Sequence, residues 1–141
     1  MYTDNNLFMS SAQAVTATAA STKSLDMATA LRNVGSGEPI ELIVQVATTA
    51  DAVGAGTVTV SLDDSADNTT FTPVVTGPAV GKATLVAGFE LLRIRLPATL
   101  RRYIQVTYTV GTGPLTAGAF NAFLNLDRQD NVARPSGFSV L

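Results

Sequence analysis

The sequence predicts an all-β protein, an antiparallel, jelly-roll-like β-sandwich with extended termini. Three observations lead to this fold class: apolar and polar residues alternate with a period of two through the middle of the chain, glycine and proline separate the alternating runs, and helical periodicity covers little of the sequence. A strand half buried against a core gives this alternation. Several short strands with turn residues between them indicate two packed antiparallel sheets.

Six runs are expected to form the strands. The clearest is 57–63, in which Val58, Val60 and Leu62 point one way and threonine and serine side chains point the other. In the last run, Phe120 shares a face with every second residue that follows it, and asparagines lie opposite. This last run is 120–126. The other four predicted strands are 41–46, 71–75, 89–96 and 104–110.

The chain is expected to form one domain over residues 1–141, the usual length of a single domain. The alternation of apolar and polar residues is missing at both ends of the chain, in an N-terminal arm (1–22) and a C-terminal tail (127–141). Either end could return to its own sandwich as an edge strand or reach a neighbouring molecule, and both alternatives stay open. One turn of helix is predicted within 24–32, where a glycine-rich stretch then stops it.

The composition argues against several classes of function. Histidine and cysteine are absent, so the commonest general base, thiol nucleophiles, disulfides and the usual transition-metal ligands are missing. We therefore expect no enzyme and no catalytic, cofactor-binding or metal-binding residues. A net charge of −2 disfavours nucleic acid as a partner. Only 14% of residues are charged, which suits a protein embedded in a larger assembly, although a neutral free-standing β-domain is the alternative.

The sequence also gives no sign of a membrane partner. Its apolar stretches fall well short of the roughly 20 residues that a membrane helix needs. The first residues lack the basic and apolar regions of a signal peptide, so synthesis in a cytoplasm is expected.

An acidic loop at 63–69 is the one dense cluster of oxygen ligands. Asp63, Ser65 and Asp67 fall at the first three ligand positions of a helix–loop–helix calcium site. Asn68 stands where that site needs glycine, and Val74 stands where it needs a bidentate glutamate. A solvated hairpin turn, held by hydrogen bonds from aspartate and asparagine side chains, is therefore favoured over calcium binding.

Two groups of residues are candidates for a partner interface. Arg93 and Arg95 alternate along one predicted strand, while Arg101 and Arg102 lie at the adjoining turn. Guanidinium groups pair well with carboxylates of another protein, but these arginines could equally be a solvated outer face. The second group is Leu7 and Phe8, part of an apolar cluster that an exposed tail does not normally carry.

Short segments along the whole chain resemble one family, the capsid cement (decoration) proteins of short-tailed bacteriophages. The resemblance rests on their order and spacing: MYTD at 1–4, ATAAST at 17–22, GEP at 37–39, ATLVAG at 83–88, LP at 96–97, RY at 102–103, YTV at 108–110, GPLTAG at 113–118 and PSGF at 135–138. It implies a structural virion protein without catalytic residues, made in the host bacterial cytoplasm. Such a protein binds the outer surface of an icosahedral capsid and stabilises it, with the major capsid protein as partner and a homodimer as the usual form.

Two other functions remain open from the sequence. One is a carbohydrate-binding β-sandwich module, which the absence of tryptophan and the presence of only 3 tyrosines disfavour because sugars stack on aromatic rings. The other is a different structural subunit of a phage head or tail.

Overall fold

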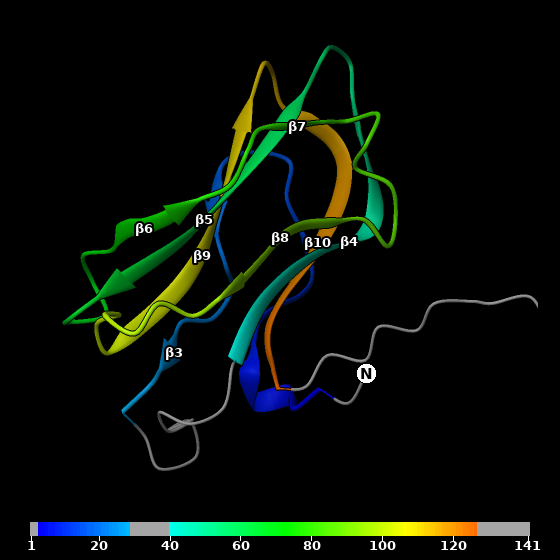
Figure 1. Cartoon of the computed structure of the whole chain (residues 1–141). Coiled ribbons are helices and arrows are strands. Elements are labelled where there is room, and N and C mark those ends of the chain that lie inside the picture. Colours follow the sequence, from blue (N-terminus) through cyan, green and yellow to red (C-terminus); the bar gives the residue numbers. More distant parts are fainter. Residues whose placement is uncertain (1–2, 29–39, 127–141) are drawn as a thin grey trace, which may run out of the picture.

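The computed structural model describes residues 3–28 and 40–126, which form two antiparallel sheets packed face to face (Figure 1). Sheet A has the strand order β1-β10-β4-β8, and sheet B has the order β2-β9-β5-β6, with β3 also paired to β9 and β7 to β5. The strands of sheet A are β1 (Phe8–Ala14), β4 (Ile40–Ala52), β8 (Glu90–Arg95) and β10 (Leu115–Leu126). Those of sheet B are β2 (Ala19–Ala20), β3 (Leu25–Asp26), β5 (Thr57–Ser65), β6 (Thr72–Thr76), β7 (Val80–Gly81) and β9 (Tyr103–Gly111). The predicted antiparallel β-sandwich is confirmed.

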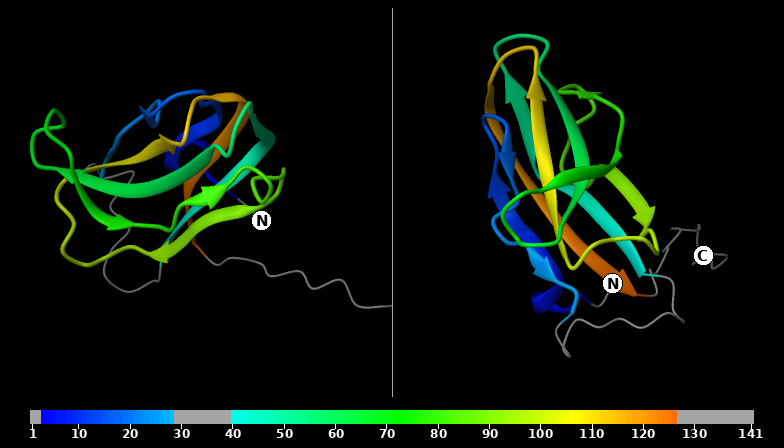
Figure 2. Two further views of the ribbon diagram at one scale, coloured as in Figure 1. Left: turned by 90° about the horizontal axis from the view of Figure 1, so that it is seen from above. Right: turned by 90° about the vertical axis from the view of Figure 1, so that its left-hand side faces the viewer.

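The core lies between the two sheets and follows the predicted alternation. Val58, Val60 and Leu62 of β5 all point inward and are fully buried. Across the core, the rings of Tyr108 on β9 and Phe120 on β10 are stacked with centroids 5.3 Å apart. Stacked aromatic pairs add to the free energy gained from burial, so this pair ties the centres of the two sheets together. Figure 2 shows the sheets as two layers from two further directions.

Two strands, β4 and β10, are longer than predicted by five residues or more. β4 and β10 pair along nearly their whole length, from Leu126 opposite Ile40 to Leu115 opposite Ala52. The register shifts around Gly118, whose φ of +145° is a conformation that L side chains rarely adopt. Such a bulge lets one strand bend while the pairing continues. The alternation is interrupted there, and for this reason the sequence pattern indicated only 41–46 and 120–126.

The N-terminal segment is part of the sandwich. A short 3-10 helix, η1 (Asn5–Leu7), leads into β1, which pairs with β10 and buries Met9. Further on, β2 pairs with β9. Over the described residues 3–22 the segment therefore follows the first alternative, an edge strand on its own sandwich, and does not extend away as an arm. The predicted C-terminal tail, 127–141, lies outside the described residues.

The helical turn predicted within 24–32 is wrong for its described part. Leu25 and Asp26 form β3, which pairs with Ile104 and Tyr103 of β9. Leu25 is buried in the core, and a strand beside β9 both buries this side chain and gives its backbone hydrogen-bond partners. Residues 29–32 of the predicted turn lie outside the described residues.

Candidate interaction surface

The sheet register places two of the predicted interface residues in one cross-strand row. Phe8 lies opposite Phe123, Phe123 opposite Ile43, and Ile43 opposite Arg93. Directly opposed residues of antiparallel strands project from the same side of a sheet. The neighbouring row, which includes Leu42 and Leu124, is buried in the core between the sheets. The row from Phe8 to Arg93 therefore lies on the outer face, defined here as the side of sheet A turned away from sheet B.

This row is apolar along most of its length and ends in a cation. The rings of Phe8 and Phe123 are stacked with centroids 5.0 Å apart, and Ile43 continues the apolar surface. Ile43 and Phe123 are only 1% and 3% exposed although they do not face the core. Arg93 at the end of the row is exposed, roughly 14 Å from Phe8 at the usual spacing of strands.

The next row of the outer face is polar. Asn125 lies opposite Glu41, and Glu41 opposite Arg95, which is exposed. Asn125 is 3% exposed, and its Nδ2 has no hydrogen-bond acceptor. A buried donor without an acceptor costs about 1–3 kcal/mol. On this side of sheet A, a buried apolar row and a buried unpartnered donor thus lie beside two exposed cations.

Arg93 and Arg95 differ from the other arginines in their pairing. Within residues 3–28 and 40–126, the ion pairs are Lys82–Asp51, Arg101–Asp64 and Arg102–Asp26, and neither Arg93 nor Arg95 takes part in one. Both side chains project from β8 on the same face, as the sequence predicted.

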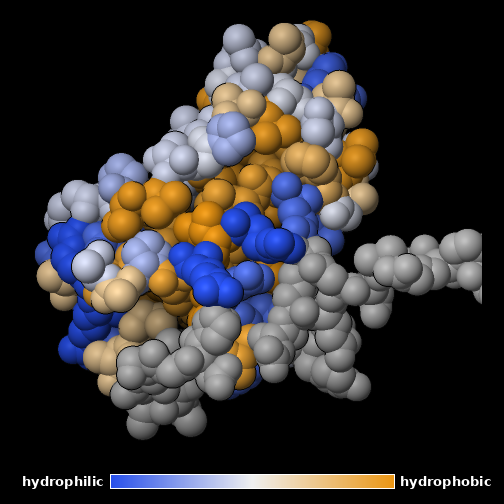
Figure 3. Space-filling model, in the orientation of Figure 1, coloured by the Kyte–Doolittle hydropathy of each residue, from blue (hydrophilic) through white to orange (hydrophobic). Residues whose placement is uncertain are grey.

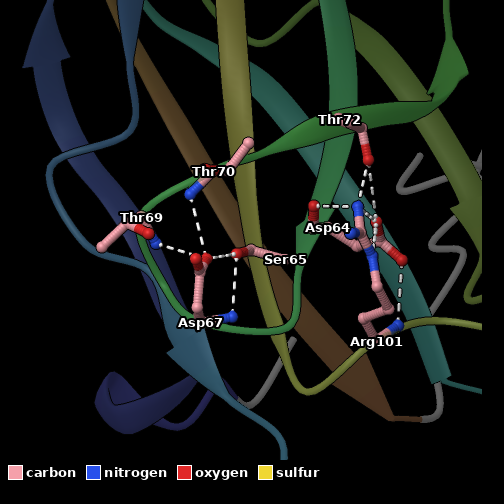
Figure 4. A network of polar contacts seen from close by, with 7 residues as sticks. All are labelled: Asp64, Ser65, Asp67, Thr69, Thr70, Thr72 and Arg101. Carbon is pink, nitrogen blue, oxygen red and sulfur yellow. Dashed lines mark hydrogen bonds and ion pairs between the residues drawn. The ribbon is translucent and has the colours of Figure 1, made fainter.

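Arg101 is held within the chain by Asp64 (Figure 4). Its backbone N–H donates to Asp64 Oδ2 over 2.9 Å, its Nε donates to Oδ1 over 2.8 Å, and its Nη2 donates to the backbone oxygen of Asp64 over 2.8 Å and to Thr72. Asp64 is buried, and the hydrogen bond from the Arg101 side chain is the main reason why the pKa of Asp64 is lowered.

Arg102 is held in a similar way. Its Nε and Nη2 donate to the two carboxylate oxygens of Asp26 over 2.9 Å and 2.8 Å, and its guanidinium lies 5.0 Å from the centre of the Tyr103 ring. The structure therefore places Arg101 and Arg102 beside sheet B, apart from Arg93 and Arg95. Leu7 packs against the core from η1. A partner contact of Leu7, Arg101 or Arg102 stays a prediction.

The acidic loop forms the predicted turn, but it starts later than the sequence suggested. Asp67 accepts hydrogen bonds from Ser65 Oγ and from the backbone N–H groups of Thr69 and Thr70 (Figure 4). Hydrogen bonds from Thr69, then from Thr70 and Ser65, hold the pKa of Asp67 well below its usual range. Asp63 belongs to β5 and is buried against Ser61 and Thr107, which both donate to it. Among the described residues, no three acidic, histidine or cysteine side chains come together as a metal site.

Sequence reasoning missed Ile43, Phe123 and Asn125 of the outer face. A signal was present: in the run 120–126, Phe123 stands on the face that otherwise carries Asn121 and Asn125. An apolar residue at a position that the alternation reserves for polar ones indicates a second buried surface. The burial and the missing acceptor of Asn125 could not be predicted, because both depend on what lies across the strands.

Comparison with known proteins points to a family. The family model described as Bbp16 matches residues 9–124, which is most of the chain. No curated protein matches. Among the described residues, none of the helices has the length and apolar character required to span a membrane.

Proposed function

We propose a function from the premise that this chain belongs to the Bbp16 family, which is phage-related. The protein is a structural, non-enzymatic component of the virion, a cement protein that binds the outer surface of the icosahedral capsid and stabilises it. Its partner is the major capsid protein. The observation that carries the proposal is the outer face of sheet A, where the half-buried ring of Phe8 and the exposed side chains of Arg93 and Arg95 are accessible to a partner. Neither arginine forms an ion pair with another described residue.

The composition of this face supports a protein–protein interface. Aromatic residues and arginine are enriched in such interfaces, with apolar residues at the centre and polar ones at the rim. The aromatic ring of Phe8 is half buried in its stack with Phe123, so it suits a packed contact better than stacking on a sugar.

Cementing needs a rigid body and differential binding. A protein that binds the assembled shell more tightly than free subunits stabilises the shell, as a ligand stabilises the state that it prefers. The two-layer sandwich supplies rigidity, and the exposed residues of the outer face supply the contact. A homodimer would strengthen attachment further, since the second contact becomes intramolecular once the first has formed. The protein is made in the host bacterial cytoplasm and acts on the outside of the assembled capsid.

Sedimentation with capsids that lack this protein tests the proposal. The wild-type protein is expected to pellet with the shells and to raise the temperature at which they break open. The variant Arg93→Glu/Arg95→Glu should lose at least tenfold in affinity, because two cations at the rim become anions. The control Lys23→Glu/Lys82→Glu changes the net charge equally at other sites and should bind like wild type.

Failure of the wild-type protein to pellet with the shells would overturn the capsid proposal. Equal binding of the two double variants would instead remove the outer face of sheet A from it. Circular dichroism and thermal unfolding of each variant check that a loss of binding does not come from a loss of fold. Localisation of the protein inside the head or on the tail by electron microscopy would favour the alternative of another structural subunit.

A further inference from the structure

Over Arg93–Arg95, β8 presents a backbone edge that pairs with no other strand of the described residues. Among the described residues it pairs only with β4, as the last strand of sheet A. The N–H of Leu96, one residue after the strand, donates to Ile40 of β4. Successive residues of a strand direct their backbone groups to alternate sides. Ile94 therefore faces β4 with its N–H and C=O, whereas Arg93 and Arg95 present theirs at the unpaired edge.

An apolar strip lies beside this edge, on the side of the sandwich where β8 and β6 approach each other. Figure 3, seen from this side, shows apolar surface across the middle of the molecule with hydrophilic side chains next to it. Partly buried apolar side chains come from three strands here: Ile94 of β8, Val75 of β6 and Val80 of β7. The approach is close, because a Cβ at Gly77 would lie 3.3 Å from Leu92 Cδ1.

Charge decides which strand could occupy the edge. Two copies of this chain paired through β8 would place the Arg93 and Arg95 side chains of one copy beside those of the other, and like charges on opposed strands are destabilising. A strand with acidic side chains would instead lie next to two cations that form no ion pair with another described residue. Its alternate side chains would point toward Ile94 and Val75, where apolar groups are favoured.

We propose that the free edge of β8 accepts an extended segment of a partner protein as a fifth strand of sheet A, and that acidic and apolar residues alternate in this segment. Backbone hydrogen bonds to Arg93 and Arg95 supply affinity, while the acidic and apolar side chains supply specificity. The inference deepens the proposed function and rests on it in one respect, namely that the segment belongs to the capsid. The competing explanation is that Arg93 and Arg95 protect the edge of β8 from pairing, as charged residues do on other edge strands. In that case an added strand would be disfavoured whatever its charge.

Peptide binding to the full-length protein separates these possibilities. Two synthetic peptides of equal length are used, one alternating valine with glutamate and one alternating valine with lysine. Fluorescence anisotropy measures affinity, and hydrogen exchange followed by NMR measures protection of individual backbone amides. The glutamate peptide is expected to bind at least tenfold more tightly than the lysine peptide and to slow exchange at Arg93 and Arg95 by a similar factor.

Charge reversal supplies the decisive comparison. The variant Arg93→Glu/Arg95→Glu should reverse the preference and bind the lysine peptide, whereas Lys23→Glu/Lys82→Glu should keep the wild-type preference. Equal affinity for both peptides, or slowed exchange at β6 in place of β8, would overturn the inference. If the protein binds capsids but hydrogen exchange at the Arg93 and Arg95 amides is not slowed, the edge-strand inference is overturned and the capsid proposal stands. Peptide binding by a protein that never pellets with capsids would support the edge site and overturn the capsid proposal alone.

Discussion

The phenol of Tyr108 donates a hydrogen bond to Ser10 Oγ over 3.0 Å, and both residues are buried between the sheets. Tyr108 belongs to β9 of sheet B and Ser10 to β1 of sheet A, so the bond connects the two layers. Ser10 in turn donates to Gln13 Oε1 over 2.7 Å. This short chain of polar contacts also anchors the N-terminal strand over the sandwich.

Burial of this phenol makes the fold sensitive to alkali. It raises the pKa of Tyr108 to about 12, whereas an unfolded chain has a tyrosine pKa of about 10. The neutral phenol is favoured in the folded state, so this contribution is complete below pH ~10 and is lost as the pH rises through ~12. The loss amounts to about 2–3 kcal/mol. Urea unfolding across this range should show it for wild type, and Tyr108→Phe should show a shallower decline. Parallel declines would contradict the assignment to Tyr108.

Asp64→Asn should lower the free energy of unfolding by about 1–3 kcal/mol, because the buried group loses its charge-assisted hydrogen bonds to Arg101. The pKa of Asp64 is lowered in the fold, so its contribution is present above pH ~4 and is lost as the pH falls toward the lowered value. Acid titration of unfolding should therefore be less steep in the variant. The matched control is Asp51→Asn, whose exposed pair with Lys82 spans 3.3 Å and should contribute little.

Gly118→Ala tests the bulge in β10. A Cβ at this position would lie 3.0 Å from the Cβ of Ala50 and would also require the rare φ of +145°. We expect a loss of about 1–3 kcal/mol in the free energy of unfolding, measured by chemical denaturation. Gly113→Ala is the control, because its φ is +103° but nothing lies within 4 Å of the added Cβ. A loss at Gly113 equal to that at Gly118 would show that φ alone decides the effect.

Asn125→Leu tests the cost of the buried donor without an acceptor. Removal of the unpartnered donor is expected to raise the free energy of unfolding by about 1 kcal/mol, measured by chemical denaturation. Asn121→Leu is the comparison, because Asn121 Oδ1 accepts a hydrogen bond from Ala12 N–H over 2.6 Å. That variant should be less stable than wild type. Destabilisation of both variants to the same extent would contradict the view that the Asn125 donor is a cost to the fold.

The fold class and the main strands could be predicted because they depend on local alternation. Val58, Val60 and Leu62 alternate with polar residues, and they are buried as the pattern requires. Leu25 and Asp26 were misassigned for the opposite reason. Two residues carry no period, and only the neighbouring strand β9 decides that they form β3.

The candidate surface was predictable in part. Phe8, Arg93 and Arg95 were identified from their residue types, but their alignment across sheet A depends on the register of four strands, which local sequence does not encode. The pairing of Arg101 with Asp64 was missed because the two residues are 37 positions apart and meet only in the folded chain. Arg101 and Arg102 are thus paired with carboxylates of their own chain, whereas Arg93 and Arg95 face outward.

Two edge strands of the described sandwich, β6 and β8, are not equivalent in their backbones. β6 ends sheet B with Pro73, which has no N–H to donate, whereas β8 ends sheet A with an unbroken backbone. An extended segment of another protein would therefore find a complete row of outward N–H and C=O groups on β8, whereas β6 lacks one of its N–H groups. Of these two edges, β8 is the better template for an added strand.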